Sequence, residues 1–214
     1  MTRKRARFPW RHNEVRTAAH TIPESAFSLI ELLLVLALIL ILTFLGAGQL
    51  TTSARRRKLA ACGSNLQKIY LALSLYRNDN SAYPFFQNAQ TSAEALDLLV
   101  PKCTTETGIF ICPASGDKAL PESESFAKRR ISYDYYMGRA TNDDANAVIL
   151  SDWQINALPK QRGHLIFSPD GKGPGRNHKD QGGNLVTCGG ELRSSTPQAA
   201  QDFVFPSTVK LLGP

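Results

Sequence analysis

The 214-residue sequence has few cysteines, no internal repeat and no low-complexity tract. It contains four Cys, 20% charged residues and 8% aromatic residues, with 43% hydrophobic residues overall. These averages exclude a collagen-like chain, a disordered acidic tail and a transporter with many membrane spans. No Cys-x-x-Cys pair and no matched Cys/His spacing occurs, so the sequence predicts no zinc site. The length allows one domain with an appendage.

Proline and acidic side chains are scarce near the N-terminus. The first 26 residues hold six basic and two acidic side chains, and no proline lies between Ala26 and Tyr83. The segment Phe27–Gly48 has 22 residues and one ionisable side chain, Glu31. A helix of that length reaches about 33 Å, enough to cross the hydrocarbon core of a bilayer. The sequence therefore predicts a membrane-spanning helix, and the basic flank 1–26 keeps the N-terminus cytoplasmic.

The net charge of +7 has a local origin. The first 26 residues contribute +4 (6 − 2), and the remaining 188 residues contribute only +3 (19 − 16). The basic character is therefore no sign of nucleic-acid binding. A second basic cluster, Arg55–Lys58, follows the apolar run and could contact phospholipid headgroups or acidic residues of a neighbouring subunit.

Residues 49–80 continue with a helical pattern. Apolar side chains recur there every three or four positions, at Leu59, Cys62, Leu66, Ile69, Leu73 and Tyr76. The turn-forming residues 78–81 and then Pro84 end the pattern. We expect one long helix, embedded in the membrane over 27–48 and amphipathic over 49–80.

Residues 81–214 are rich in turns. Ten of the 12 prolines lie at or after Pro84, and a helical period recurs only near 93–100. Short β-prone runs predict strands at 131–137, 147–152, 164–167, 184–187, 191–193 and 203–205. Gly189 and Gly190 suit a tight turn. The expected fold class is α+β, with the long N-terminal helix packed against a small, loop-rich antiparallel sheet in the domain 81–214.

The residues around Glu31 resemble the N-terminal signature of type IV prepilins and type II secretion pseudopilins. The matching segment is Ala26-Phe27-Ser28-Leu29-Ile30-Glu31-Leu32. The resemblance implies a pilin-like fold, cleavage by prepilin peptidase between Ala26 and Phe27, and N-methylation of Phe27. It also makes Glu31 the glutamate at the fifth position of the mature chain. Ala26 stands where the family usually has glycine.

A carboxylate within a membrane helix needs a partner. It costs about 2.5–3.5 kcal/mol on insertion scales, and the α-ammonium of Phe27 on an adjacent copy could neutralise Glu31. Such a pair would set the register between subunits of a filament. Glu31 could instead reach the headgroups by snorkelling, but Phe27 and the apolar run Leu32–Leu42 favour the filament interpretation. A secretory signal peptide is disfavoured, because its apolar core spans about 7–15 residues.

A second resemblance, to bacterial pseudopilin-like proteins, extends over more of the chain. The segments that carry it are Cys62-x-x-Asn65-Leu66, Phe110-Ile111-Cys112-Pro113, Ser132-Tyr133, and His178 with Cys188-Gly189. Those proteins have Asp-Gly where this sequence has Cys188-Gly189. The segment from His178 to Gly189 resembles a structural hairpin more than a reaction centre.

The four cysteines would all lie on the exported, oxidising side of the membrane. Three pairings are possible. Cys103 with Cys112 is the local choice, and it leaves Cys62 with Cys188, which would tie the sheet to the helix. Each bridge would stabilise the fold by about 2–4 kcal/mol. Buried free thiols are the alternative.

Acidic loops offer calcium candidates at Asp143, Asp144 and Asp170. Calcium prefers oxygen ligands, and the major pseudopilins that this chain resembles often bind calcium in loops of their sheet. The ligand pattern of a known calcium loop is absent, which favours solvated turns. We therefore predict no metal and no cofactor.

The sequence predicts a structural subunit of a type IV pilus-like or type II secretion pseudopilus filament, and not an enzyme. Its expected partners are further copies of itself, prepilin peptidase, other pseudopilins and the inner-membrane assembly platform. It would cross the bacterial inner membrane once, with residues 81–214 in the periplasm, before joining the filament. The alternative is a membrane-anchored periplasmic binding or enzymatic domain that does not polymerise. Cys188 with His164 or His178 would be its nucleophile and base, although nothing local supports a catalytic cysteine.

Overall fold

The computed structural model describes residues 28–122 and 124–214, apart from the side chains of residues 45–51. The expected leader 1–26 and the expected cleavage position between Ala26 and Phe27 lie outside the described residues. The chain divides into two compact units, Met1–Gly46 and Ala47–Pro214. One helix, α1 (Leu29–Asn80), contributes residues to both units.

In the first unit, the described residues are helical and mostly apolar. The carbonyl of Ser28 accepts the backbone N–H groups of Glu31 and Leu32, at 3.0 and 3.1 Å, where α1 begins. The large apolar side chains from Leu29 to Phe44 are 42–86% exposed. Over the described residues, no helix is long and apolar enough to cross a membrane. The expected span Phe27–Gly48 includes positions that are not described.

In the second unit, α1 is amphipathic, as the spacing of its apolar residues predicts. Leu66, Ile69 and Leu73 are completely buried. The helix ends where the turn-forming residues predict: the side-chain amide of Asn80 donates to the carbonyl of Tyr76 at 2.8 Å, and Ser81 adopts a left-handed φ of 56°.

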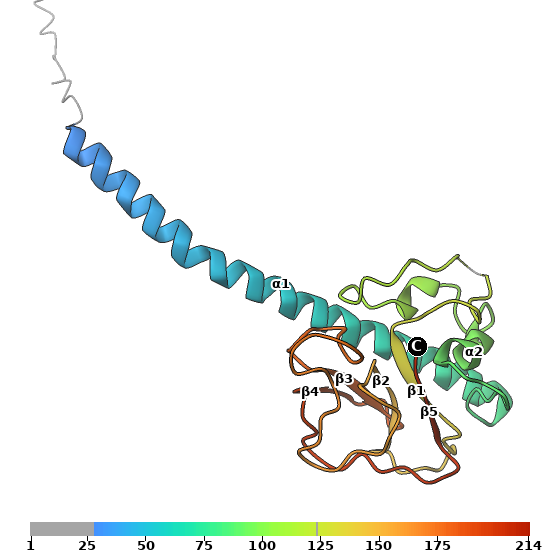
Figure 1. Cartoon of the computed structure of the whole chain (residues 1–214). Helices are drawn as coiled ribbons and strands as arrows, with labels where there is room; N and C mark the ends of the chain where they lie inside the picture. The colour runs from blue at the N-terminus through green and yellow to red at the C-terminus, as the bar shows by residue number, and fades with distance from the viewer. Residues whose placement is uncertain (1–27, 123) are drawn as a thin grey trace, which may run out of the picture. The chain divides into compact units, whose positions relative to one another are not determined.

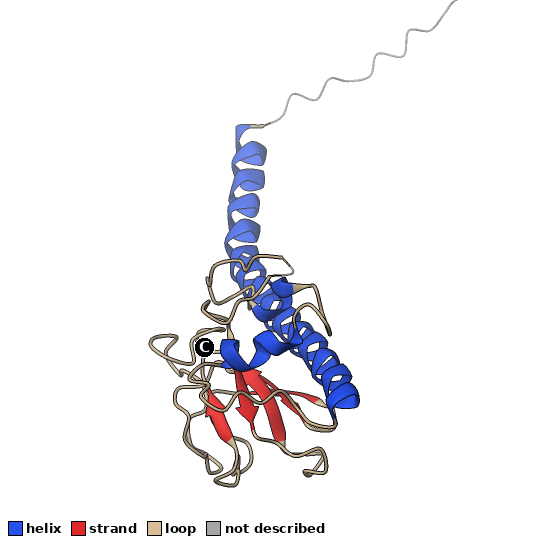
Figure 2. Ribbon diagram, turned by 90° about the vertical axis from the view of Figure 1, so that its right-hand side faces the viewer, coloured by secondary structure: helices blue, strands red, loops and turns tan. Residues whose placement is uncertain are grey.

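The second unit contains one antiparallel sheet of five strands in the order β4-β3-β2-β1-β5, and is therefore α+β (Figure 1). The strands are β1 (Tyr133–Met137), β2 (Val148–Asp152), β3 (Gly183–Thr187), β4 (Leu192–Ser195) and β5 (Lys210–Leu212). The remaining helices are short: α2 (Ser92–Leu96), η1 (Asp97–Leu99) and η2 (Thr107–Phe110). Much of this unit is loop, as Figure 2 shows in tan.

Apolar side chains cover both faces of the central strands. On β1, Tyr133 and Tyr135 join a core that includes Leu66 and Leu73 of α1, whereas Tyr136 joins a second core with Phe167. Successive side chains of a strand point to opposite faces, so the two cores lie on opposite sides of the sheet. All five residues of β1, of β2 and of β3 are accordingly buried.

Four of the six predicted strands are confirmed and two are wrong. The predicted strands 164–167 and 203–205 form only isolated bridges, Leu165 with Gln198 and Lys160 with Phe203. These loops supply Ile166, Phe167 and Phe203 to the second core, so their apolar pattern reflects burial without strand pairing. The sequence does not predict the edge strand β5, because three residues are too few to show the alternating pattern of a strand.

The disulfide in the structure differs from the local choice, Cys103 with Cys112. Cys62 is bonded to Cys112, with Cα atoms 5.2 Å apart, and the described chain leaves Cys103 and Cys188 free. The side-chain amide of Asn65 donates to the carbonyl of Ile111 at 3.1 Å, which holds the segment before Cys112 against α1. Cys188 lies instead beside Tyr70, whose hydroxyl donates to its carbonyl at 2.8 Å. Tyr70 is eight residues past Cys62, about 12 Å along the helix.

The Cys62–Cys112 bond should contribute substantially to stability. The bond joins residues 50 apart in the sequence, and loop closure of that length is worth about 4 kcal/mol in the chain-entropy model. We expect Cys112→Ser to lower the free energy of unfolding by about 3–4 kcal/mol, measured by chemical unfolding of the full chain in detergent. Cys103→Ser, which removes a free thiol, should change it by less than about 0.5 kcal/mol. Equal losses in both variants would contradict this pairing.

Candidate functional site

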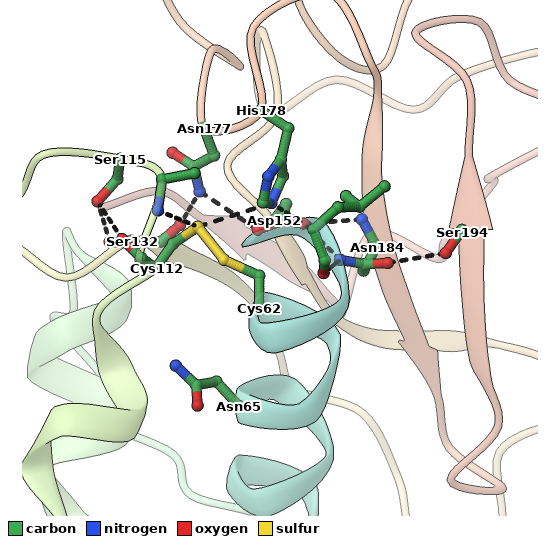
Figure 3. Close-up of polar contacts among 12 residues, drawn as sticks. Cys62, Asn65, Cys112, Ser115, Ser132, Asp152, Asn177, His178, Asn184 and Ser194 are labelled. Carbon is green, nitrogen blue, oxygen red and sulfur yellow. Dashed lines mark hydrogen bonds and ion pairs between the residues drawn. A yellow bond between two sulfur atoms is a disulfide. The ribbon is translucent and has the colours of Figure 1, made fainter. Parts of the chain in front are cut away.

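Polar and sulfur-bearing side chains gather where α1 meets the ends of two strands. Cys62 comes from α1, Cys112 from the segment after η2, Asp152 from the end of β2, and His178 from the loop before β3. We call these four residues the Cys–Asp–His cluster. Figure 3 shows Asn177, His178 and Asp152 gathered over the disulfide.

The four members of the cluster are in mutual contact and buried. His178 Nε2 lies 3.6 Å from Cys112 Sγ and 3.1 Å from Asp152 Oδ2. Cys62 and Asp152 have no exposed surface, Cys112 has 1% and His178 has 4%. A histidine in this position touches both a sulfur atom and a carboxylate inside the protein, out of contact with bulk water.

Asp152 accepts several hydrogen bonds besides its contact with His178. The backbone N–H of Asn184 donates to Oδ2 at 2.8 Å, and the Asn184 side-chain amide lies 3.2 Å from the same oxygen. The Asn177 side-chain amide lies 3.3 Å from Oδ1. A buried carboxylate is tolerated when donors surround it in this way.

The close approach of β3 to Asp152 leaves little room for a side chain at position 183. A Cβ atom there would lie 2.7 Å from Phe167 Cζ, closer than such atoms come in proteins, and 3.0 Å from Asp152 Cβ, a tight contact. Gly183 therefore allows the N–H of Asn184 to reach the carboxylate.

The same two asparagines extend the network to other elements. Asn184 donates from its side chain to the carbonyl of Leu59 on α1, at 2.9 Å, and accepts from Ser194 on β4, at 2.9 Å. Asn177 donates to the carbonyl of Ser132, just before β1, at 2.7 Å. Asp152 and its two asparagines thereby connect α1 with β2, β3, β4, the loop before β3 and the chain before β1.

An open hollow of about 160 Å³ lies beside the cluster. Asn177 and His178 line one part of it, and three cationic residues, Arg55, Lys58 and Lys179, line another. Ala114, two residues after Cys112, also contributes. Lys58 and Lys179 thus place positive charge near the buried histidine, while Arg55 also pairs with Asp180 at 3.7 Å.

The structure brings only some of the site residues predicted from the sequence together in one place. Glu31 lies in the first turn of α1, in the first unit. Cys188 shares no hydrogen bond with His164 or His178 in the described chain, and burial raises the pKa of the Cys188 thiol. A thiol held protonated is a poor nucleophile. Among the described residues, Cys188 therefore forms no nucleophile–base pair with either histidine.

The three calcium candidates make local contacts in separate turns. Asp143 pairs with Arg139 at 3.4 Å, and Asp144 accepts the backbone N–H of Asn146 at 2.9 Å. Asp170 accepts from the Ser168 hydroxyl and from the Lys172 backbone N–H, which lower the pKa of its carboxyl. Over the described residues, none of the three belongs to a group of three or more metal-ligating side chains.

Sequence reasoning missed Asp152 entirely. It follows a hydrophobic strand, Val148-Ile149-Leu150-Ser151, so its carboxylate comes at the point where the chain leaves the sheet. An acidic residue at the end of a hydrophobic strand could have marked Asp152 as a candidate site residue. Nothing in the sequence indicates that His178 and Cys112 would contact this carboxylate.

A second buried carboxyl, Asp134, lies in a different environment. Its Oδ2 accepts the backbone N–H of Gln154 at 2.8 Å, whereas Oδ1 has no hydrogen-bond partner in the described structure. Burial raises the pKa of the Asp134 carboxyl well above its ordinary value, with a further increase from Asp152 and opposing effects of the Gln154 N–H and of Lys160.

Comparison of the chain with protein family models, with curated proteins and with solved structures finds no match. The chemistry of the site therefore has to be inferred from its own geometry. The Cys–Asp–His cluster combines a disulfide, an imidazole and a carboxylate without an exposed nucleophile. It can hold elements together, and its donor atoms could hold an ion.

Replacing Asp152 should test its role in holding the second unit together. In Asp152→Asn, an amide group would face the donors of Asn184, and the contact between the carboxylate and His178 Nε2 would be lost. We expect the free energy of unfolding of the full chain in detergent to fall by about 2–4 kcal/mol. Asp180→Asn is the matched control, because Asp180 is 58% exposed and pairs with Arg55 at 3.7 Å; it should change stability by less than about 0.5 kcal/mol. Comparable effects of the two variants would disprove the central role of Asp152.

Asp134 should make stability decrease as the pH rises. The folded state binds its proton more tightly than the unfolded chain, whose Asp pKa is about 3.9. Above that pH the unfolded state holds fewer protons, so the free energy of unfolding falls with rising pH until the folded pKa is passed. We expect Asp134→Asn to gain stability relative to the wild type by up to about 1.4 kcal/mol per pH unit in this range. Chemical unfolding at pH 5 and pH 7 measures this; a difference independent of pH would contradict it.

Proposed function

We propose that this chain is a structural subunit of a type IV pilus-like or type II secretion pseudopilus filament. It would be made as a precursor in the bacterial inner membrane, cut between Ala26 and Phe27, and assembled through its N-terminal helix. The observation that carries the proposal is the lone Glu31 in the apolar segment Phe27–Gly48. The prepilin-like sequence around it is the only indication of the machinery involved.

The physical argument concerns what covers the apolar face of the helix. The large apolar side chains between Leu29 and Phe44 are 42–86% exposed in the single chain. Apolar surface on this scale is unfavourable in water. Lipid covers it before assembly, and the equivalent helices of neighbouring subunits cover it in a filament. A helix that only anchors the chain in the membrane gains nothing from Glu31. In a filament, Glu31 would pair with the amine of Phe27 on a neighbouring subunit and so set the register between the two subunits.

The second unit fits the outer part of such a subunit. Its segment of α1 is covered on one side by the sheet and linked to it through the Cys62–Cys112 bond. Leu71 and Leu75, four residues apart on α1, are 62% and 54% exposed, which leaves an apolar strip for a neighbouring subunit.

Replacing Glu31 by Ala tests the assembly step. We expect Glu31→Ala to insert into the membrane normally and to reduce filaments at least tenfold, since the charge that sets the register is lost. Filaments sheared from cells that also carry the prepilin peptidase and assembly platform are quantified by immunoblot, and carbonate extraction checks insertion. Mass spectrometry of the mature chain should find methylated Phe27 at its start.

Glu106→Ala is the matched control, because Glu106 is an exposed acid that pairs with Lys68 at 2.8 Å. It should leave filament yield unchanged. Normal filament formation by Glu31→Ala would refute the register argument. A mature chain that begins elsewhere, with no self-association on crosslinking, would support the non-polymerising, membrane-anchored alternative.

A further inference from the structure

Four potential metal ligands converge inside the second unit. The Sγ atoms of Cys62 and Cys112, a carboxylate oxygen of Asp152 and a ring nitrogen of His178 all lie within 4.8 Å of one another. In the described part of the chain, no other His, Cys, Asp or Glu side chains form such a group of three or more. The four ligands come from distant positions, so no spacing motif reveals them.

We propose that the Cys–Asp–His cluster has two states: a disulfide when oxidised, and a four-coordinate zinc site when Cys62 and Cys112 are reduced. The zinc ligands are the two thiolates, Nε2 of His178 and one oxygen of Asp152. This site is separate from the proposed filament function and does not depend on it.

The donor set is that of zinc. Two sulfurs, one imidazole nitrogen and one carboxylate oxygen suit a tetrahedral Zn²⁺ ion, whereas calcium and magnesium require mostly oxygen ligands. Zinc bond lengths of about 2.0–2.3 Å place ligand atoms about 3.3–3.8 Å apart. The present distances from His178 Nε2, 3.1 Å to Asp152 and 3.6 Å to Cys112, are close to those values. The two bonded sulfurs have to separate, and the remaining ligand atoms already lie within 4.8 Å of one another.

The surroundings already orient the ligands. Asn184 and Asn177 donate to the carboxylate of Asp152 and fix its direction. The backbone N–H of Ala114 lies 3.4 Å from Cys112 Sγ and can stabilise a thiolate. Partners of this kind are characteristic of metal sites and contribute to affinity.

The charge around the cluster and the access to it from solvent also suit a zinc ion. Two thiolates and one carboxylate around Zn²⁺ leave a net charge of −1, with a neutral imidazole. The cationic side chains of Lys58 and Lys179 line the hollow that reaches His178 and offset this charge, whereas Arg55, which also lines it, pairs with Asp180 at 3.7 Å. The same hollow offers a route for the ion.

A dithiol reductant converts the disulfide state of the cluster to the reduced state. Thiol–disulfide exchange transfers two electrons and two protons from the dithiol to the protein, which gives the thiols of Cys62 and Cys112 and a cyclic disulfide. Zinc then displaces both thiol protons into solvent. In the zinc-bound state Nε2 of His178 coordinates the ion, so the one proton of the ring is on Nδ1.

Metal titration of the purified full chain in detergent tests the proposal. The protein is reduced with a phosphine, desalted without oxygen and titrated with cobalt(II) chloride, then with zinc(II) chloride. We expect one cobalt ion per reduced chain with a thiolate-to-cobalt charge-transfer absorption, displaced by one zinc ion, and no tight binding to the oxidised chain. His178→Gln should weaken zinc binding at least tenfold, whereas His164→Gln, at an exposed position, should not.

Alkylation gives a second measurement that needs no variant. Bound zinc should protect Cys62 and Cys112 from iodoacetamide, read by peptide mass spectrometry, and leave the labelling of Cys103 unchanged. Absence of a thiolate-to-cobalt absorption in the reduced wild type, or equal labelling with and without zinc, would overturn the proposal. Wild-type affinity in His178→Gln would also overturn it. If His178→Gln does not fold, the two wild-type measurements decide.

Discussion

The buried carboxylate of Asp152 is the interaction on which the second unit depends. A carboxylate without water needs donors from several directions, and they come from different parts of the chain: the backbone and side chain of Asn184, the side chain of Asn177 and the ring of His178. Through the other hydrogen bonds of the two asparagines, this requirement also fixes α1 and the chain before β1. One charge therefore determines how helix, strands and loop fit together, and removing one partner leaves the others unpaired.

Two further constraints act beside this charge. The Cys62–Cys112 bond joins α1 to the segment after η2 covalently. Apolar packing on both faces of the sheet closes the unit, with α1 on one face and long loops on the other. Because the loops supply Ile166, Phe167 and Phe203 to the second core, they are as necessary to the fold as the strands. This explains how so small a sheet can have three strands buried along their full length.

The two proposals assign different roles to the two units. The first unit, with Glu31 and exposed apolar side chains, offers surface for lipid and for copies of itself. The second unit contains a polar centre whose sulfur atoms can be bonded to each other or available to a metal. A chain exported in the reduced form meets oxidising conditions only afterwards. The state of the Cys–Asp–His cluster would then report whether zinc or an oxidant reached the domain first.

The sequence by itself determined the regular elements: an apolar segment with one acid, an amphipathic helix ending at Asn80, and four of the strands. These follow from local periodicity and turn chemistry, which act over a few residues. Only the tertiary structure decided that Cys62 bonds to Cys112, that residues 164–167 and 203–205 cover a core without forming strands, and that Asp152 meets His178. These outcomes depend on which distant segments pack together. The position of Cys188 beside Tyr70, about two turns of α1 beyond Cys62, was enough to change the pairing.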